Sequence, residues 1–267
     1  MTSSFVETLA IASEPRLHRF HPPPEPEGFA PRRGGQKPPA RAAAPPAVVT
    51  DKMRAAVDAG SIVSFVAGLN EQEKSDVIYS VQLAQRAASA KHDRFAATKD
   101  WYDLYVDVLG KLGWAVEAFA FAEHGTSKGE FSMDKSALDV IATIATGAQL
   151  AILVKTIDTL KKLGDGDRAL RIFDIQAAKD LSGNFQIGAA QKADNAALSV
   201  ALGAFHFETN DHRGKFLFFA WGAEEIRFWT AVSKMTLNRD LYSVHRRAVV
   251  AKLKADAADY VAELEIA

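Results

Sequence analysis

The sequence predicts an α+β fold in which an N-terminal helical part packs on a central antiparallel four-stranded sheet, followed by a closing C-terminal helix. Two observations lead to this prediction. First, 48% of the 267 residues are hydrophobic, which is enough to bury a substantial core. Second, the apolar periodicity changes from helical to alternating at residues 184–238. Four candidate strands follow one another there: NFQIGAAQ, ALSVALGAFHFETN, KFLFFAW and EIRFWTAVSKMTLN.

Charge and composition exclude several classes of protein. The chain has 32 Lys and Arg against 33 Asp and Glu, so it has no long-range field that would attract nucleic acid or an anionic membrane. It has no cysteine, which excludes disulfides, thiolate nucleophiles and cysteine-based metal sites. The N-terminal residues lack the charged start and apolar centre of a secretory signal. We therefore expect a cytoplasmic protein, or one exported without a classical signal peptide, and no cofactor.

Residues 1–47 form a proline-rich arm that precedes a single α+β domain at residues 48–267. The arm includes HPPPEPEGFAPRRGGQKPPARAAAPP, and proline fixes φ and removes backbone donors, so we expect it to be disordered or extended. One interpretation is a flexible tail. The other is an arm that docks on a neighbouring subunit or another protein through scattered apolar anchors. The candidate anchors are Phe5, Leu9, Ile11, Phe20 and Phe29.

The segment before the sheet is predicted to be helical. Thr50 and Asp51 supply capping chemistry before MRAAVDAGSIVSFVAG, which predicts a first helix. Asn70 and Glu73 form a capping-box pattern at the start of a second helix. DWYDLYVDVLGKLGWAVEAFAF predicts a third, although residues 114–122 also alternate well enough to be a short strand.

Residues 134–163 form the longest periodic run and predict one long helix. Its centre, ALDVIATIATGAQLAILV, is almost uncharged on every side, which favours a buried core helix or an element that inserts conditionally into membranes. Asp139 and Gln149 oppose stable insertion. The candidate membrane-contact residues are Ile141, Ile144, Leu150, Ile152 and Leu153. ALRIFDIQAAKDL predicts a further short helix.

Turn chemistry and periodicity complete the predicted fold. The segment NDHRG has the residues of a hairpin loop, so KFLFFAW is expected to be the antiparallel neighbour of the preceding strand. The closing helix is predicted over RDLYSVHRRAVVAKLKADAADYVAEL. Its inward-facing residues are expected to be Leu241, Val244, Ala248 and Leu253.

The seven histidines form no recognisable catalytic or metal-binding pattern. No pair has the helical spacing of a zinc hydrolase, and neither a phosphate-cradling loop nor a nucleophile elbow is present. His206 and Glu208 share a strand face and could act as an acid–base pair, but a structural histidine is far more common. We therefore predict no catalytic residue and a protein that is not an enzyme.

Several short patches resemble a known family. They are KHDRF at residues 91–95, DWYDLY at 100–105, LGKLGWAVEAF ending at Phe119, NFQIG at 184–188 and MTLNRDLY at 235–242. These patches resemble the Erwinia virulence factor-like family of bacterial and fungal proteins. The resemblance implies a mixed α+β fold, no established enzymatic activity, and a role in insect-gut persistence or toxicity. That virulence factor depends on a lipid-modified cysteine, which this chain lacks, so acyl anchoring does not carry over.

The leading hypothesis is a non-enzymatic, virulence- or toxin-like bacterial protein that acts through membrane or protein contact. A second hypothesis is a self-assembling subunit whose N-terminal arm docks on neighbouring subunits. A third is a small-ligand binder or enzyme that uses the sheet face near His206. The expected partners are a second copy or another protein at the arm, with conditional membrane contact and no nucleic acid.

Overall fold

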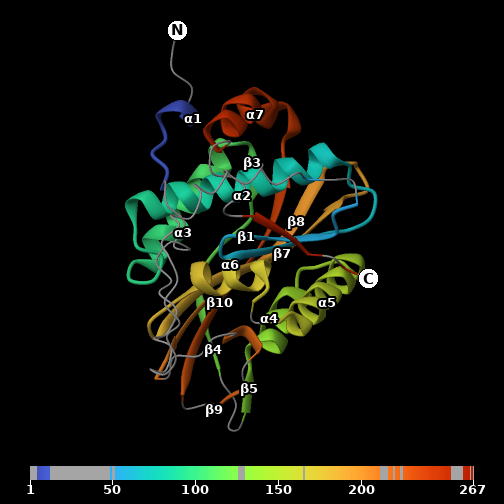
Figure 1. Ribbon diagram of the computed structural model, residues 1–267. Helices are drawn as coiled ribbons and strands as arrows, with labels where there is room; N and C mark the ends of the chain where they lie inside the picture. Colours follow the sequence, from blue (N-terminus) through green and yellow to red (C-terminus); the bar gives the residue numbers. More distant parts are fainter. Residues whose placement is uncertain are drawn as a thin grey trace, which may run out of the picture.

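The computed structural model places a large mixed sheet between two layers of helices (Figure 1). It describes residues 5–12, 49, 52–125, 130–164, 166–210, 216–218, 220–222, 225–253, 261–264 and 266. Seven α-helices lie in this described part. The prediction of a mixed fold of helices packed on a sheet is therefore confirmed, but the sheet is larger than the predicted four strands.

The central sheet has nine strands. Seven run in the order β11-β1-β2-β7-β8-β10-β3, while β4 pairs with β10 and β6 pairs with β7. Every pairing is antiparallel except that of β2 with β7. A separate ribbon pairs β5 with β9. The strands are β1 (Ala55–Asp58), β2 (Ser61–Phe65), β3 (Trp114–Val116), β4 (Ala122–His124), β5 (Glu130–Ser132), β6 (Ala178–Lys179), β7 (Ser182–Lys192), β8 (Leu198–Thr209), β9 (Ala220–Gly222), β10 (Ile226–Leu237) and β11 (Val261–Leu264).

The predicted first helix is wrong, because residues 55–65 form the hairpin β1–β2. Ala59 adopts a φ of 52° and, with Gly60, turns the chain between the strands. Every residue of both strands is buried, since β11 and β7 pair with the outer edges and helices cover both faces. Valine, isoleucine and phenylalanine favour such a buried strand. The strands that pair with this hairpin, β7 and β11, lie far away in the sequence. The local periodicity of residues 55–65 therefore could not show that these residues form strands.

Two predictions near the C-terminal part are also wrong. KFLFFAW is not a strand of the central sheet: Phe216–Phe218 form a 3-10 turn, and β9 pairs with β5 instead. The place beside β8 is taken by β10, which pairs with it along its whole length. Most of the predicted NDHRG turn lies outside the described residues. The closing helix α7 (Arg239–Leu253) is shorter than predicted, and β11 follows it as an edge strand beside β1.

One face of the sheet is covered by α2 (Glu71–Lys91), α3 (Thr98–Lys111) and α7, with α1 (Phe5–Thr8) packed beside α7 (Figure 1). The predicted capping box is confirmed, because the Asn70 side chain accepts from the Glu73 amide and the Glu73 carboxylate accepts from the Asn70 amide. The strand alternative within residues 114–122 is confirmed in β3. Gly113, with a φ of 101°, makes the turn into that strand.

The opposite face is covered by α4 (Met133–Ala142), α5 (Gly147–Lys162) and α6 (Arg168–Ala177). The single helix predicted at residues 134–163 is therefore wrong. Thr146 interrupts it by capping α5, and its hydroxyl accepts the Gln149 amide while the Gln149 side chain accepts the Thr146 amide. No helix of the described part is long and apolar enough to cross a membrane.

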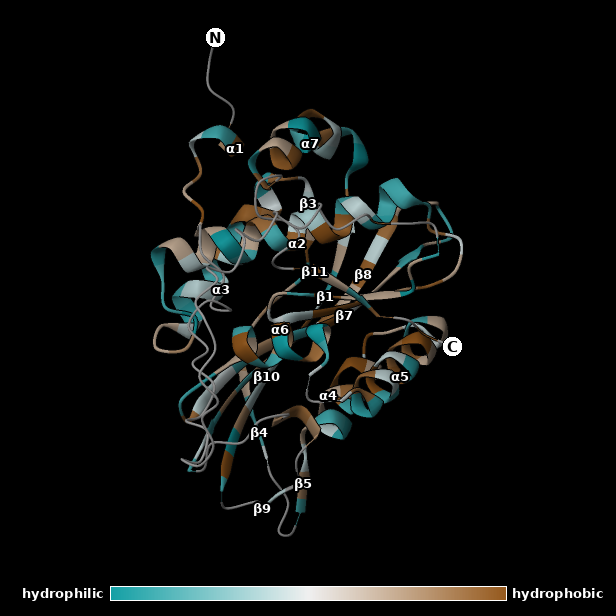
Figure 2. Ribbon diagram, in the orientation of Figure 1, coloured by the Kyte–Doolittle hydropathy of each residue, from teal (hydrophilic) through white to brown (hydrophobic). Residues whose placement is uncertain are grey.

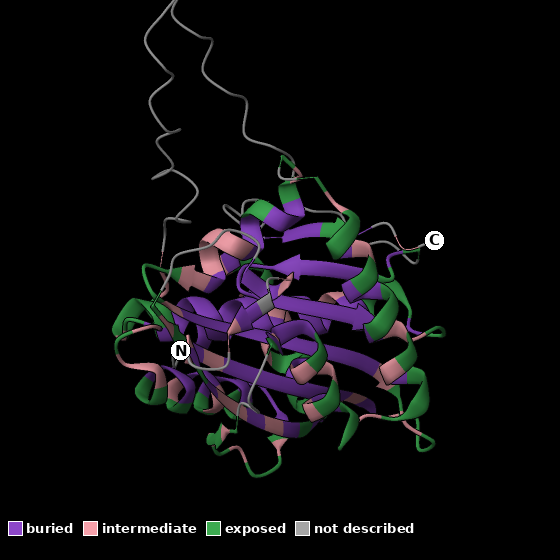
Figure 3. Ribbon diagram, turned by 90° about the horizontal axis from the view of Figure 1, so that it is seen from below, coloured by how far each residue is buried: buried purple, intermediate pink, exposed green. Residues whose placement is uncertain are grey.

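Residues of the strands belong to two separate clusters of buried apolar side chains, so the sheet divides the interior into two cores. Figure 3 shows that the strands of the central sheet are largely buried, and Figure 2 shows the hydropathy of their residues. On the side of α4, α5 and α6, phenylalanines from neighbouring strands stack, as Phe205 and Phe228 do with ring centres 5.7 Å apart. On the other side, Leu202 and Ala204 of β8 meet the α2 and α3 layer.

Candidate functional site

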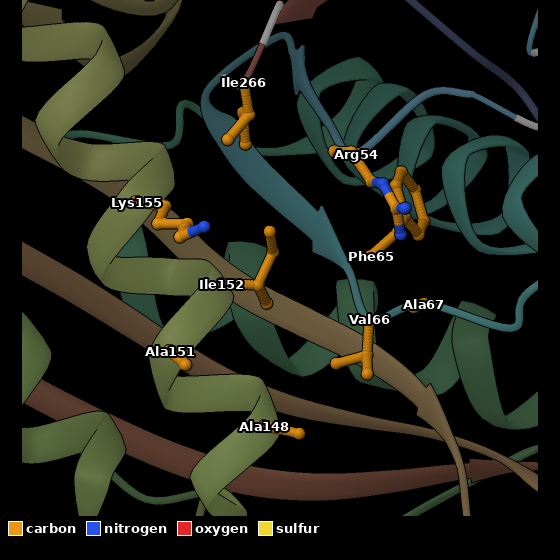
Figure 4. Close-up of a pocket in the computed structure, with 9 residues that line it drawn as sticks. All are labelled: Arg54, Phe65, Val66, Ala67, Ala148, Ala151, Ile152, Lys155 and Ile266. Carbon is orange, nitrogen blue, oxygen red and sulfur yellow. The ribbon is translucent and has the colours of Figure 1, made fainter.

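A surface cavity of about 400 Å³ lies between α5 and the end of β2 (Figure 4). Its lining combines small and branched apolar residues with two cations. One wall comes from α5, and the other comes from the β1–β2 region together with Ile266, which follows β11. The lining residues are Arg54, Phe65, Val66, Ala67, Ala148, Ala151, Ile152, Lys155 and Ile266.

Backbone and side-chain hydrogen bonds fix both walls. On the strand side, the Phe65 amide donates to the Arg54 carbonyl at 2.7 Å. The Val66 amide donates to the carbonyl of Ala190 on β7 at 2.9 Å. These bonds hold the two residues against the sheet as the chain leaves β2.

On the helix side, two polar contacts fasten α5 to the sheet. The Gln149 side chain donates to the Ala189 carbonyl at 2.8 Å, and the hydroxyls of Thr156 and Ser64 lie 2.8 Å apart. All these groups except the carbonyl belong to side chains that are buried, so the contacts cost little entropy once α5 is packed. The cavity walls are therefore preformed.

The two cations give the cavity its electrostatic character. Figure 4 shows Lys155 pointing from α5 toward the space and Arg54 lying beside the ring of Phe65. Within the described residues, neither side chain forms an ion pair. Two such cations beside an apolar lining can bind a ligand that has an anionic head and a hydrocarbon part.

The structure places the five predicted membrane-contact residues in different surroundings. Ile152 lines the cavity, while Ile141 and Leu153 are fully buried in the core. Ile144 and Leu150 are half-buried. Sequence reasoning missed Arg54 and Lys155, because they are about 100 residues apart and only the packing of α5 against β2 brings them to one cavity.

A second cavity of about 420 Å³ lies between β4, β5 and α4. It is more polar, and its charges are mixed, because Lys161 is 3.4 Å from the Asp134 carboxylate and Glu130 also lines the space. This mixture indicates no ligand class. Its lining residues are His124, Gly125, Glu130, Phe131, Ser132, Lys135, Ser136, Lys161 and Phe218.

His206 lies at neither cavity. Its Nδ1 is 2.9 Å from the Gly183 carbonyl, so the proton sits on Nδ1, and its ring is 5.2 Å from that of Trp229. Its Nε2 is 3.9 Å from the Glu208 carboxylate. Burial lowers the pKa of His206, while the Glu208 charge opposes that shift. These contacts describe a histidine that is held in the sheet, and use of this face by an enzyme or ligand stays a prediction.

A buried polar cluster fills the layer between the sheet and α2–α3. The Gln85 side chain donates to the Asp58 carbonyl at 3.0 Å, and Tyr102 donates to the Asn184 side chain at 2.7 Å. Arg94 donates to Gln85 and Asn184, both at 3.4 Å. Burial raises the pKa of Asp58 well above its ordinary value, opposed by the charge of Arg86.

The structure places part of the predicted arm on the chain itself. Phe5, Leu9 and Ile11 pack against the core beneath α2 and α7, and Val6 is fully buried there. The Arg86 side chain donates to the Ala12 carbonyl at 2.8 Å. The other two candidate anchors, Phe20 and Phe29, lie outside the described residues. Docking of the arm on a neighbouring subunit stays a prediction.

These features define a protein with a mixed sheet between two helical layers and a preformed cavity that combines apolar and cationic groups. No family model matches the chain, and no curated protein does. Solved structures do resemble it. One is titled "DELTA-ENDOTOXIN", with 9% identity, a TM-score of 0.42, and coverage of 80% of this chain and 96% of the other.

Two further structures carry more specific titles. The Evf virulence factor is 12% identical with a TM-score of 0.34, covering 85% of this chain and 86% of the other. The activated Cyt2Ba monomer from Bacillus thuringiensis subsp. israelensis is 8% identical with a TM-score of 0.43, covering 67% of this chain and 97% of the other. The resemblance to the virulence factor inferred from the sequence is thus confirmed as a weak one. Likeness at this level carries no argument about function.

Proposed function

We propose that this protein is a non-enzymatic, virulence- or toxin-like bacterial protein that acts by contacting anionic lipid at a membrane surface. The observation that supports this proposal is the cavity between α5 and β2. It brings two cations, Arg54 and Lys155, which form no ion pair with any residue that the structure describes, to an apolar lining at the protein surface. A phospholipid presents the complementary chemistry, an anionic head joined to a hydrocarbon chain.

The expected binding free energies favour a site that combines cations with an apolar lining. Each cation near an anionic membrane surface contributes about 1 kcal/mol, and each buried methylene of an acyl chain contributes about 0.8 kcal/mol. Two cations and a few methylenes together therefore give a useful affinity, whereas either element alone gives a marginal one. The neighbouring surface of α5 adds Val154, whose side chain is 40% exposed.

Vesicle co-sedimentation tests this function. The full-length protein is mixed with vesicles of phosphatidylcholine alone or of phosphatidylcholine with phosphatidylserine. We expect binding to the mixed vesicles that falls as salt is added, because exposed charges are screened. The double variant Arg54→Gln, Lys155→Gln is expected to lose most of that binding.

Lys91→Gln provides the matched control for the single variants Arg54→Gln and Lys155→Gln, because each of the three removes one positive charge. Lys91 is an exposed cation on α2, in the helical layer that covers the other face of the sheet from α5, and its loss changes the net charge without touching the cavity. Binding that falls equally in Lys91→Gln and the cavity variants would show only a general charge effect. Absence of wild-type binding to mixed vesicles at low salt would contradict the proposal.

The alternative function is a self-assembling subunit. The complete burial of Val6 favours this alternative. The site in which Val6 is buried could also accept the N-terminal segment of a second copy, so that two copies exchange these segments. Sedimentation velocity of the full chain and of a variant without residues 1–46 tests it. An assembly that becomes monomeric in the shortened chain is expected, and an unchanged monomer in both would exclude this alternative.

A further inference from the structure

The outer surface of α7 is unusually apolar. Five large hydrophobic side chains are exposed in the described part of the protein, and three of them lie on this one helix. Val244 is 77% exposed and Leu241 is 56% exposed, the two highest values in that set. The set comprises Val154, Leu181, Leu241, Val244 and Val250.

The sequence predicted that Leu241 and Val244 face inward, and the structure contradicts this. Tyr242, Val249 and Leu253 form the buried face of α7 instead. Polar contacts lock that rotation, because Arg246 donates two hydrogen bonds, of 2.8 and 2.7 Å, to the carboxylate of Asp76 on α2. A bidentate pair of this kind fixes orientation as well as position. Leu241 and Val244 therefore remain on the outer surface.

The spacing of the outward apolar residues is that of a helix that pairs with another helix. Positions 241, 244, 248 and 251 are separated by three, four and three residues, which is the a/d spacing of paired helices. The last two are alanines, and Ala248 also packs against the core. Ala251 is exposed, and Ala248 is half-buried at the margin of the stripe.

Charges on this surface favour a protein partner over an anionic lipid. Other cations of α7 are already engaged: Arg239 pairs with Glu73 at 3.2 Å, and Lys252 donates to the Glu7 carbonyl at 2.9 Å. That leaves Asp240 and Arg247 beside the apolar stripe, one charge of each sign. Neither has an ion-pair partner among the described residues.

We propose that α7 pairs antiparallel with α7 of a second copy of this chain. A two-fold axis between Leu241 and Val244 sets each Leu241 against Val244 of the second copy. In the same arrangement Asp240 lies beside Arg247 of the second copy, twice over, because a two-fold interface repeats every contact. Both charges and the two large apolar residues, Leu241 and Val244, thereby gain partners, while Ala248 and Ala251 extend past the start of the other α7 at Arg239.

The pairing is weak because the surface is small. One helix pair buries less than the roughly 1,200–2,000 Å² of a stable interface, so the dimer forms only at high protein concentration. It does not depend on the proposed lipid contact. The helix α7 belongs to one helical layer and α5 to the other, so the dimer leaves the cavity open (Figure 1).

Sedimentation equilibrium of the full-length protein over a concentration series tests the pairing. We expect a monomer–dimer equilibrium in the wild type and a dissociation constant at least about tenfold higher in Val244→Arg, because each new charge is then placed against the apolar side chain of Leu241 in the second copy. Val244 is exposed and arginine is a good helix former, so the thermal midpoint of this variant should match that of the wild type. The control is Ser243→Arg, which adds the same charge one position away from the stripe.

Charge reversal gives a second and independent measurement. Asp240→Arg is expected to weaken the dimer, and adding Arg247→Asp to it is expected to restore the association. A wild type that stays monomeric at every concentration would overturn the proposal, and so would a dimer that Val244→Arg leaves unchanged. If Val244→Arg instead abolishes vesicle binding without altering the dimer, the stripe is a lipid-contact surface and not a site of self-association.

Discussion

Arg94 and Asn184 are joined by two hydrogen bonds that connect the α2–α3 turn to β7. The Arg94 guanidinium donates to the Asn184 side-chain oxygen at 3.4 Å, and the Asn184 amide donates to the Arg94 carbonyl at 2.7 Å. Both residues are buried, and Arg94 also lies 4.5 Å from the ring centre of Trp101. The pair therefore fastens the helical layer to the centre of the sheet.

Asn184→Ala is expected to lower the free energy of unfolding by about 2–3 kcal/mol, because it leaves a buried carbonyl and the Tyr102 hydroxyl with fewer partners. Urea unfolding followed by circular dichroism measures this change. Asn195→Ala, in the exposed turn between β7 and β8, is the matched control and should cost much less. Equal losses in the two variants would contradict the role assigned to the pair.

The buried carboxyl of Asp58 is expected to make the folded protein less stable as pH rises. Its carboxyl is fully buried and its two oxygens accept no hydrogen bond within the described residues, and burial raises its pKa well above 3.8. The unfolded chain therefore releases this proton at a lower pH than the folded protein. Its contribution to stability is complete below pH 3.8 and declines as pH rises toward the raised folded pKa.

The charged and titratable groups that face Asp58 come from both covering helices. Arg86 on α2 favours the carboxylate. Burial raises the pKa of Tyr79 on α2 and of Tyr105 on α3, and the Asp58 charge raises both further. In Asp58→Asn, stability should fall less with rising pH than it does in the wild type. Urea midpoints measured across a pH series for both proteins check this, and parallel curves would contradict it.

Replacing Gly183 or Gly110 with alanine is expected to change the stability of the protein in opposite directions. A methyl group at Gly183 would overlap the ring of Phe207, so Gly183→Ala is expected to cost about 1–3 kcal/mol through overpacking. A methyl group at Gly110, within α3, would meet open space, so Gly110→Ala should add about 0.5–1 kcal/mol of stability. Thermal unfolding of both variants tests the pair, and a stabilised Gly183→Ala would show that the sheet is less tightly packed than described.

A bulky side chain placed in the cavity shows whether lipid enters the cavity or is only attracted to the cations at its edge. Ala151 lines the cavity on an exposed part of α5, so Ala151→Phe should weaken binding to phosphatidylserine vesicles roughly tenfold while all charges remain. Ala142→Phe adds the same ring at an exposed position on α4, outside the cavity. Unchanged binding by Ala151→Phe would show that lipids touch the cations without entering.

Sequence reasoning worked where local chemistry decides the structure. The capping box at Asn70 and Glu73 and the alternation in β7, β8 and β10 were sufficient to predict those elements. It failed for β1 and β2, where an alanine- and valine-rich stretch fits either structure and the long-range pairing with β7 and β11 decides. It also joined α4 to α5, because the polar cap at Thr146 lies inside an apolar run.

The candidate sites were harder to predict. Ile152 was identified on its apolar pattern, but Arg54 and Lys155 belong to no motif and meet only in the folded chain. For α7, the sequence correctly placed Leu253 and Ala248 toward the core, but it also placed Leu241 and Val244 there, and these two are exposed. The Arg246–Asp76 contact settles the rotation of that helix, and its two residues are 170 positions apart.

The pairing of β1 with β11 has a consequence for synthesis of the protein. Ala55 lies opposite Leu264, about 200 residues later, so this part of the sheet cannot close until residues 261–264 have left the ribosome. Until then the outer edge of β1 exposes to solvent unpaired backbone groups and side chains that are buried in the folded protein. We infer that chaperone demand during translation is concentrated on this hairpin. Shortened chains that lack residues 261–264 should aggregate through it.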